Sequence, residues 1–473
     1  MMSSILISLF AMSPAAHAEG SAQLPGQWLL VDNVLYVDIV DPETERIGFT
    51  GNGGMVVRAP DGTDLGVLVS GGEMVLSGLP DGAYQLRPQV EQRGDWDISV
   101  VDATDSGGRL HSLDWMLDAR GYDDPYGFDG MFYGRVDGGE DGRSAVIALE
   151  LNGWTGHRWT AMATGHGVDG WDAGRSVDRY QAEVEPDIPL YLSPPSVVGD
   201  APVTPDASGL EFEMNDRSDE FGGVFRFSVS HRGTWRIVCD NVADGVVDPT
   251  DNTNVVLSGL SDGPEDIEVE WDGHTWDGGY ISGAGECGVT LSIGELHFLA
   301  DDIETAFPGL RTYLHDGGSD TPAPMFWNDA LVAGDDVAMP DGELALAAAG
   351  PDGVIPDGIG SEPIPNVSSR AWGNFDDVGK GDRSMLDTWT FADRSDAFIV
   401  DVTDFGGPGD RDDSTNNNGS GYQAPEPEVV VEALATGGYF KGGCSTVSGS
   451  AGSAGLLALF AGLASFGMRR RED

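Results

Sequence analysis

The chain has 473 residues and a formal net charge of −54, from 79 acidic and 25 basic side chains. It is too long for one ordinary domain and, at 40% hydrophobic residues, too apolar to be disordered throughout. Nucleic acid is excluded as a partner because a phosphate backbone needs clustered Lys and Arg, whereas a cationic surface ligand is compatible with this charge. A plainer interpretation is that the negative charge only keeps the protein soluble, in a salty habitat where high ionic strength screens the self-repulsion.

Residues 1–18 are predicted to be a signal peptide. The apolar run that starts at Ile5 closes on Ala16-His17-Ala18, the small-x-small pattern of a secretory cleavage site. We therefore expect cleavage after Ala18 and export of the rest of the protein. No Lys or Arg precedes the apolar run, which leaves the true translation start open.

The body, residues 19–405, has the pattern of many short strands. Apolar residues alternate over strand-length runs such as residues 35–40 and 131–136, and Asp-Gly pairs suited to tight turns recur throughout. This predicts a mostly β fold of several tandem antiparallel β-sandwich modules. The modules are placed at residues 19–103, 104–196, 197–318 and 319–405.

The third module, residues 197–318, carries a family resemblance. It contains Trp271-Asp272-Gly273, a Gly-rich turn at residues 278–283 and a closing apolar run at residues 289–293. This pattern resembles the immunoglobulin-like repeats related to the flagellar hook-capping protein, which are common on exported bacterial proteins. The resemblance implies an immunoglobulin-like fold here. The family's Gly-x-Tyr before the last strand is replaced by residues 283–287.

A candidate calcium loop lies inside this module. Acidic residues fall at positions 1, 5, 9 and 12 of an EF-hand-like loop, and Gly245 stands at position 6, where a sharp turn is wanted. Val242 at position 3, and Asp in place of Glu at position 12, depart from the pattern, and a polar hairpin loop is the alternative. The proposed Ca²⁺ ligands are Asp240, Asp244, Asp248 and Asp251.

The C-terminal region has the layout of a stalk and a sorting tail. Residues 406–443 are poor in apolar side chains and are expected to form a disordered acidic stalk. Gly442-Gly443-Cys444 is followed by a predicted apolar helix and then by Arg469, Arg470 and Arg471.

This arrangement, residues 444–473, resembles the MYXO-CTERM sorting tail of myxobacteria and their relatives. The resemblance implies that a sorting protease acts near Cys444 and that this cysteine anchors the protein to the cell envelope. The arginines would act as the membrane stop. The protein would then be held at the cell surface, on the outer membrane, with its body outside the cell.

If Cys444 is the anchor, the other two cysteines are left as a pair. Cys239 and Cys287 can oxidise to a disulfide in an exported protein, and two free buried thiols are the alternative.

No catalytic set is evident in the sequence. Residues 259–263 match the Gly-x-Ser-x-Gly elbow of serine hydrolases, but residues 75–82 repeat nearly the same phrase with Pro80 at the position of the serine. We therefore expect a non-catalytic surface protein with an adhesive, matrix or cell-contact role. The alternative is a surface hydrolase or carbohydrate-binding accessory protein that stacks a glycan on exposed tryptophans, although such tryptophans are more often core residues. The candidate tryptophans are Trp154, Trp159 and Trp171.

Overall fold

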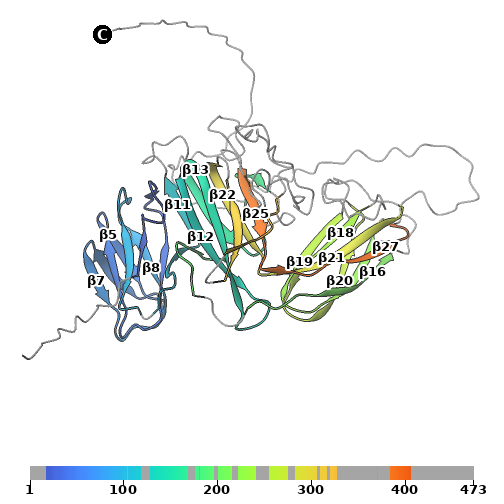
Figure 1. Ribbon diagram of the computed structural model, residues 1–473, viewed down its shortest axis with the longest axis horizontal. Helices are drawn as coiled ribbons and strands as arrows, with labels where there is room; N and C mark the ends of the chain where they lie inside the picture. Colours follow the sequence, from blue (N-terminus) through green and yellow to red (C-terminus); the bar gives the residue numbers. More distant parts are fainter. Residues whose placement is uncertain are drawn as a thin grey trace, which may run out of the picture. The chain divides into compact units, whose positions relative to one another are not determined.

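The computed structural model describes most of the body and shows a protein built of β-strands (Figure 1). Every ladder between the described strands is antiparallel, and the described residues contain no helix. The mostly β prediction is confirmed, whereas the predicted C-terminal helix lies outside the described residues. The structure describes residues 17–103, 105–118, 128–168, 176–180, 182–196, 201–215, 222–240, 255–274, 283–305, 309–316, 320–327, 370 and 384–405.

The N-terminal strands form two sheets around one hydrophobic core. The first sheet has the order β1 (His17–Gly20), β9 (Asp97–Val101), β4 (Arg46–Thr50) and β7 (Gly72–Val75). The second is one end of a 15-stranded sheet and has the order β10 (Leu110–Ser112), β3 (Leu35–Ile39), β8 (Gly82–Pro88), β5 (Gly54–Arg58) and β6 (Asp64–Val69). In β3 the burial alternates strictly, which places Leu35, Val37 and Ile39 in the core with Phe49 of the first sheet.

The rest of the 15-stranded sheet is organised by one long strand, β13 (Ser144–Thr164). It continues from β10 through β15 (Leu190–Tyr191), β12 (Phe128–Asp137), β13, β22 (Leu296–Thr305) and β25 (Ser384–Thr390) to β14 (Val177–Asp178). Outside this path lie β2 (Trp28–Leu29), β11 (Asp114–Asp118), β23 (Arg311–His315) and β24 (Asp320–Pro322). The register of β13 against β22 shifts between Gly156 and Thr160, and β11 and β23 also pair with β13. One strand therefore has four partners along its length.

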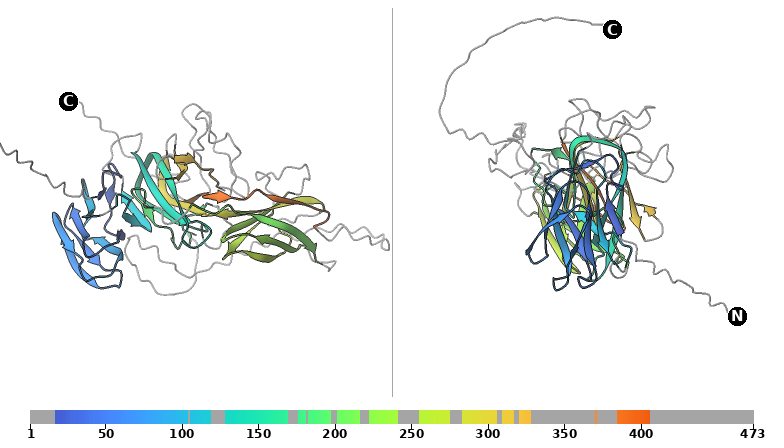
Figure 2. Two further views of the ribbon diagram at one scale, coloured as in Figure 1. Left: turned by 60° about the horizontal axis from the view of Figure 1, so that its bottom comes forward. Right: turned by 90° about the vertical axis from the view of Figure 1, so that its left-hand side faces the viewer.

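Two further sheets enclose a second core, rich in aromatic side chains. The three-stranded sheet has the order β16 (Ala207–Met214), β17 (Gly223–Val229) and β20 (Glu265–Trp271). The five-stranded sheet contains β19 (Val255–Ser261), β18 (Gly233–Asp240), β21 (Gly285–Ile293), β26 (Asp393–Arg394) and β27 (Phe398–Val402). Phe225 and Trp271 of one sheet and Ile237 of the other belong to this core, and the two layers can be followed in Figure 2.

Strand pairing cuts across the predicted module boundaries. β21 lies within residues 197–318 but pairs with β27, which lies within residues 319–405. β22 leaves these two sheets and pairs with β13. The turn between β21 and β22 requires Gly294, whose φ is 61° and where a Cβ would lie 2.6 Å from the carbonyl oxygen of Asp137.

The five-stranded sheet contains a disulfide. Cys239 of β18 and Cys287 of β21 face each other in the ladder, are fully buried and are bonded to each other. The bond therefore links two neighbouring strands of one sheet and closes a loop that spans 48 residues of sequence.

Removing this disulfide should destabilise the two sheets around it. A closed loop of this length restricts the unfolded chain, and the chain-entropy model gives a loss of about 4 kcal/mol in the free energy of unfolding when the bond is absent. Urea unfolding followed by tryptophan fluorescence, with and without reductant, measures the change. The Cys444→Ser variant is the control, since it keeps the bond and should respond to reductant as the wild type does. Equal midpoints in oxidised and reduced samples would contradict the expectation.

Candidate functional site

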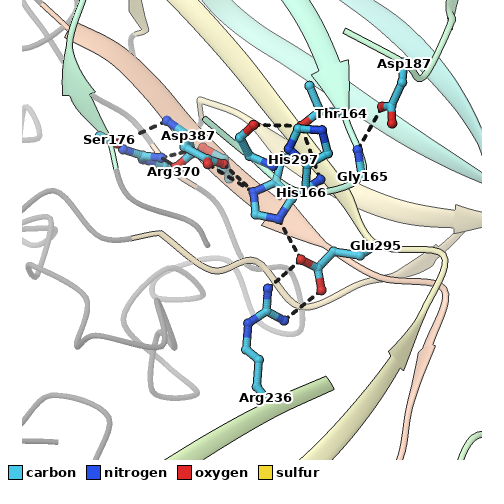
Figure 3. A network of polar contacts seen from close by, with 12 residues as sticks. Thr164, Gly165, His166, Ser176, Asp187, Arg236, Glu295, His297, Arg370 and Asp387 are labelled. Carbon is cyan, nitrogen blue, oxygen red and sulfur yellow. Dashed lines mark hydrogen bonds and ion pairs between the residues drawn. The ribbon is translucent and has the colours of Figure 1, made fainter. Parts of the chain in front are cut away.

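Four charged side chains meet in the interior, in what we call the buried charge cluster (Figure 3). Arg236 comes from β18, Glu295 directly precedes β22, His297 lies in β22 and Asp387 lies in β25. These side chains are between 0% and 4% exposed. The cluster therefore joins the five-stranded sheet to the 15-stranded sheet.

Each group in the cluster is bound by an opposite charge. Arg236 Nη1 donates to Glu295 Oε2 at 2.7 Å, and Nη2 donates to the other carboxylate oxygen. Nε2 of His297 lies 2.6 Å from Glu295 Oε1, and its Nδ1 lies 2.9 Å from Asp387 Oδ1. Because both ring nitrogens face carboxylates, the imidazole donates from both and is positively charged. Two cations and two anions then balance.

The pKa values follow from these contacts. Burial alone would raise the pKa of Glu295, but the Arg236 guanidinium and the His297 ring outweigh it and lower the pKa to about 2. Burial would lower the pKa of His297, but the Asp387 and Glu295 carboxylates raise it to about 9. Glu295 is therefore ionised and His297 protonated at neutral pH.

Aromatic rings and backbone contacts close the space around the cluster. The Arg236 guanidinium carbon lies 3.9 Å from the ring centre of Trp389, and the His297 ring stacks on the same indole at 5.8 Å. A Cβ at Gly167 would lie 2.7 Å from Asp387 Oδ2 and 3.0 Å from His297 Nδ1. Not even a methyl group fits beside the His–Asp pair at this position.

A second arginine fixes the backbone of β25. Arg370 is fully buried, and its Nη1 donates to the carbonyl oxygen of Asp387 at 2.7 Å. Its guanidinium carbon lies 4.9 Å from the ring centre of Trp327. The backbone N–H of Asp387 donates to Ser176 Oγ at 3.1 Å. Both the backbone and the side chain of Asp387 are therefore held.

This geometry supports a structural role for the cluster. A general base needs a nitrogen within hydrogen-bond reach of a substrate proton, whereas His297 is fully buried and both its nitrogens are engaged. What the arrangement does is fix the distance and register between β18, β22 and β25.

The Gly-x-Ser-x-Gly match lies at the end of β19 and in the turn that leads from the five-stranded sheet to β20 of the three-stranded sheet. Ser261 ends β19 and β20 begins at Glu265, so no helix follows the serine as the hydrolase elbow requires. Ser261 is 2% exposed, and its hydroxyl donates to the carbonyl oxygen of Gly263 at 2.6 Å. The side chain shapes the turn and is not presented as a nucleophile.

The other sequence-predicted residues lie in strands or outside the described part of the chain. Ala18 lies in β1, opposite Ser99, and Asp240 ends β18 opposite Glu286. Outside the described residues lie Asp244, Asp248, Asp251, Cys444, Arg469, Arg470 and Arg471. Within the described residues, no three His, Cys, Asp or Glu side chains are placed to hold a metal ion, and no helix could span a membrane.

The exposed-tryptophan hypothesis is wrong for two of its three residues. Trp154 and Trp159 are both 0% exposed and belong to the main hydrophobic core, and Trp159 Nε1 donates to Gln27 Oε1 at 2.9 Å. Their rings pack against each other at 5.8 Å inside this core. Trp171 lies outside the described residues.

Sequence comparisons add no family. The chain matches no protein-family model, and no curated protein matches it.

Neutralising Glu295 should strongly destabilise the protein. Glu295→Gln leaves Arg236 buried without its carboxylate, and breaking a buried pair in this way costs about 3 to 5 kcal/mol in the free energy of unfolding. The matched control is Glu213→Gln, because Glu213 pairs with Arg226 at 2.6 Å but is 72% exposed, and loss of an exposed pair costs at most about 1 kcal/mol. Urea unfolding of both variants tests this, and similar losses would argue against a structural cluster.

Stability should also depend on pH in a defined window. Glu295 contributes stability above its ordinary pKa of 4.5, and the contribution is lost as pH falls towards 2. His297 contributes stability below its ordinary pKa of 6.5, and the contribution is lost as pH rises through 9. The cluster is therefore most stabilising between pH 4.5 and 6.5.

We expect the urea midpoint of the wild type to fall between about pH 5.5 and about pH 9.5 by more than that of His297→Gln, which has no imidazole to titrate. Parallel midpoint curves for the two proteins would show that His297 does not carry the alkaline loss.

Proposed function

We propose that this protein is a non-catalytic exported protein, held at the outer surface of a bacterial cell by its C-terminal tail. Its body would serve adhesion, matrix contact or contact between cells. The observation that carries the proposal is the order of Gly442-Gly443-Cys444, an apolar segment and an arginine cluster at the end of an acidic β-rich chain. The buried disulfide is consistent with export, since such bonds persist in oxidising compartments.

Two features support the finer proposal of immunoglobulin-like sandwiches. The second core lies between β16, β17 and β20 on one side and the five-stranded sheet on the other. Without the two-residue strand β26, these are seven strands, the number typical of this architecture. In the N-terminal sheets, the buried Tyr84 donates its hydroxyl to the carbonyl oxygen of Pro80 at 2.7 Å, as in a tyrosine corner. The Cys239–Cys287 bond differs from the inter-sheet disulfide of antibody domains, because it lies within one sheet.

The proposed route begins with cleavage after Ala18. The mature chain would then start at Glu19, whose buried carboxylate accepts the backbone N–H groups of Arg109 at 2.7 Å and Leu110 at 2.8 Å. At the other end, a sorting protease would act near Cys444 and leave this residue attached to the outer membrane. Calcium binding by the loop from Asp240 to Asp251 stays a prediction.

Changing the anchor should release the protein from the membrane. In a myxobacterial host, the wild type is expected in the outer-membrane fraction, where protease added to intact cells digests its body. Cys444→Ser should be lost from that fraction, because a hydroxyl is a far weaker nucleophile than a thiolate for attachment. Ser445→Ala is the matched control and should behave as the wild type.

Cell fractionation and mass spectrometry of both termini provide the measurement. A mature protein found in the cytosol with Met1 intact and Cys444 unmodified would overturn the proposal.

A further inference from the structure

One face of the 15-stranded sheet carries a row of ring side chains that we call the tyrosine row. Ladder partners run from Tyr36 to His111, then to Tyr191 and Tyr133, and on through Ala148 to Tyr313. Directly paired residues project to the same face of a sheet, so these side chains share one face. The core residues alternate with them on the opposite face. From β3 to β23 the row crosses five strand spacings, which is roughly 24 Å.

The row is rigid because its members are fixed by one another and by charged neighbours. The ring of His111 lies 5.4 Å from that of Tyr36 and 4.6 Å from that of Tyr191. Asp38 accepts a hydrogen bond from the Tyr191 hydroxyl at 2.8 Å, and its other oxygen lies 3.2 Å from His111 Nε2. These contacts keep the middle of the row in place.

Tyr133 lies between Tyr191 and Ala148 in the row and is also fixed. Its hydroxyl donates to the sulfur of Met131 at 3.3 Å, and its ring meets that of His315 edge to face at 5.8 Å. Tyr133 is partly exposed, unlike Tyr191, which is 1% exposed. The Tyr133 ring is therefore available to a ligand without a change in the sheet.

A hollow of about 480 Å³ opens beside Tyr133. Glu150 and Asn152 of β13 and Asp129 of β12 supply oxygen atoms to it, and Gln23 and Ser193 supply polar groups from two loops. This volume lies within the range of small-ligand sites, roughly 300 to 1,000 Å³.

We propose that this hollow binds a neutral saccharide. A sugar ring has a C–H face and a rim of hydroxyl groups, so its face suits the Tyr133 ring and its hydroxyls suit the carboxylate and amide oxygens around it. The net charge of −54 disfavours an anionic saccharide. Glu150 already accepts from the Tyr313 hydroxyl at 2.6 Å and lies 3.7 Å from Arg311, so it carries little unbalanced charge for a cationic ligand.

This inference deepens the proposed function, because it gives an adhesive body a class of ligand. It places that ligand on tyrosine in the sheet face instead of on Trp154 or Trp159, which are buried.

Titration calorimetry of the purified full-length protein tests the site. The probes are cellohexaose, laminarihexaose and mannohexaose as neutral chains, and hexagalacturonate as an anionic one. We expect at least one neutral chain to bind and hexagalacturonate not to bind. Absence of binding to all three neutral chains, or binding to hexagalacturonate alone, would overturn the proposal.

Substitutions at the hollow locate the binding. Tyr133→Ala should weaken the affinity for the bound sugar at least about tenfold through loss of the stacking surface, and Asn152→Ala should weaken it without removing the ring. Tyr180→Ala is the matched control, because Tyr180 is 89% exposed and does not line the hollow. Circular dichroism checks that each variant folds, and Asn152→Ala decides the question if Tyr133→Ala does not fold. Unchanged affinity in a folded variant of either residue would refute the site.

The outcome is independent of localisation. If the protein binds a neutral sugar but proves cytosolic, the surface role is refuted and the sugar site stands. If it is correctly anchored but binds no neutral sugar, the sugar site is refuted and the surface role stands.

Discussion

The carboxylate of Glu295 is the contact on which the arrangement of the two sheet systems depends. It accepts from Arg236 of the five-stranded sheet and from His297 of the 15-stranded sheet, with all three side chains buried. Removing charges from water costs several kcal/mol for each ion, and this cost is offset only when opposite charges contact each other in good geometry. A slip of one residue in β22 would turn His297 to the other face and leave charges unpaired. The cluster therefore favours the observed register of β22 over registers shifted by one residue.

The cluster matters for the fold because the chain passes between the two sheet systems more than once. The polypeptide passes from β21 into β22, crosses the large sheet and returns through β25 and β26 to complete the five-stranded sheet with β27. The pairing of β21 with β27 joins residues more than a hundred positions apart, and closing a loop of that length costs entropy before any contact is gained. The disulfide ties β18 to β21, the strand on which β27 pairs, and the charge cluster ties β18 to the 15-stranded sheet.

The sequence was sufficient to predict where strands form, but it was insufficient to predict which strands pair with each other. Alternation in residues 35–39 follows directly from one buried and one solvated face, and it appears in the structure as expected. The assumption that neighbouring strands share a module fails at Ile293, where the chain changes sheets at a glycine. Trp154 and Trp159 were ambiguous for a related reason, because β13 packs on both faces and the sequence does not say which residues face the core. One signal was present and missed: Glu295 and His297 are two apart in an otherwise apolar run, where only paired charges are tolerated.

The same reasoning separates the two polar regions of the 15-stranded sheet. At the charge cluster each charged side chain contacts an opposite charge and aromatic rings cover the group, so its contacts hold the fold together. Beside Tyr133 the polar groups border an open hollow, and the nearest ring is fixed by its neighbours but not covered by them. Buried groups whose charges are balanced by one another indicate a structural role, whereas a rigid aromatic surface with accessible oxygen atoms indicates recognition. By this criterion the face that carries the tyrosine row, and not the charged interior, is where a ligand of this protein should bind.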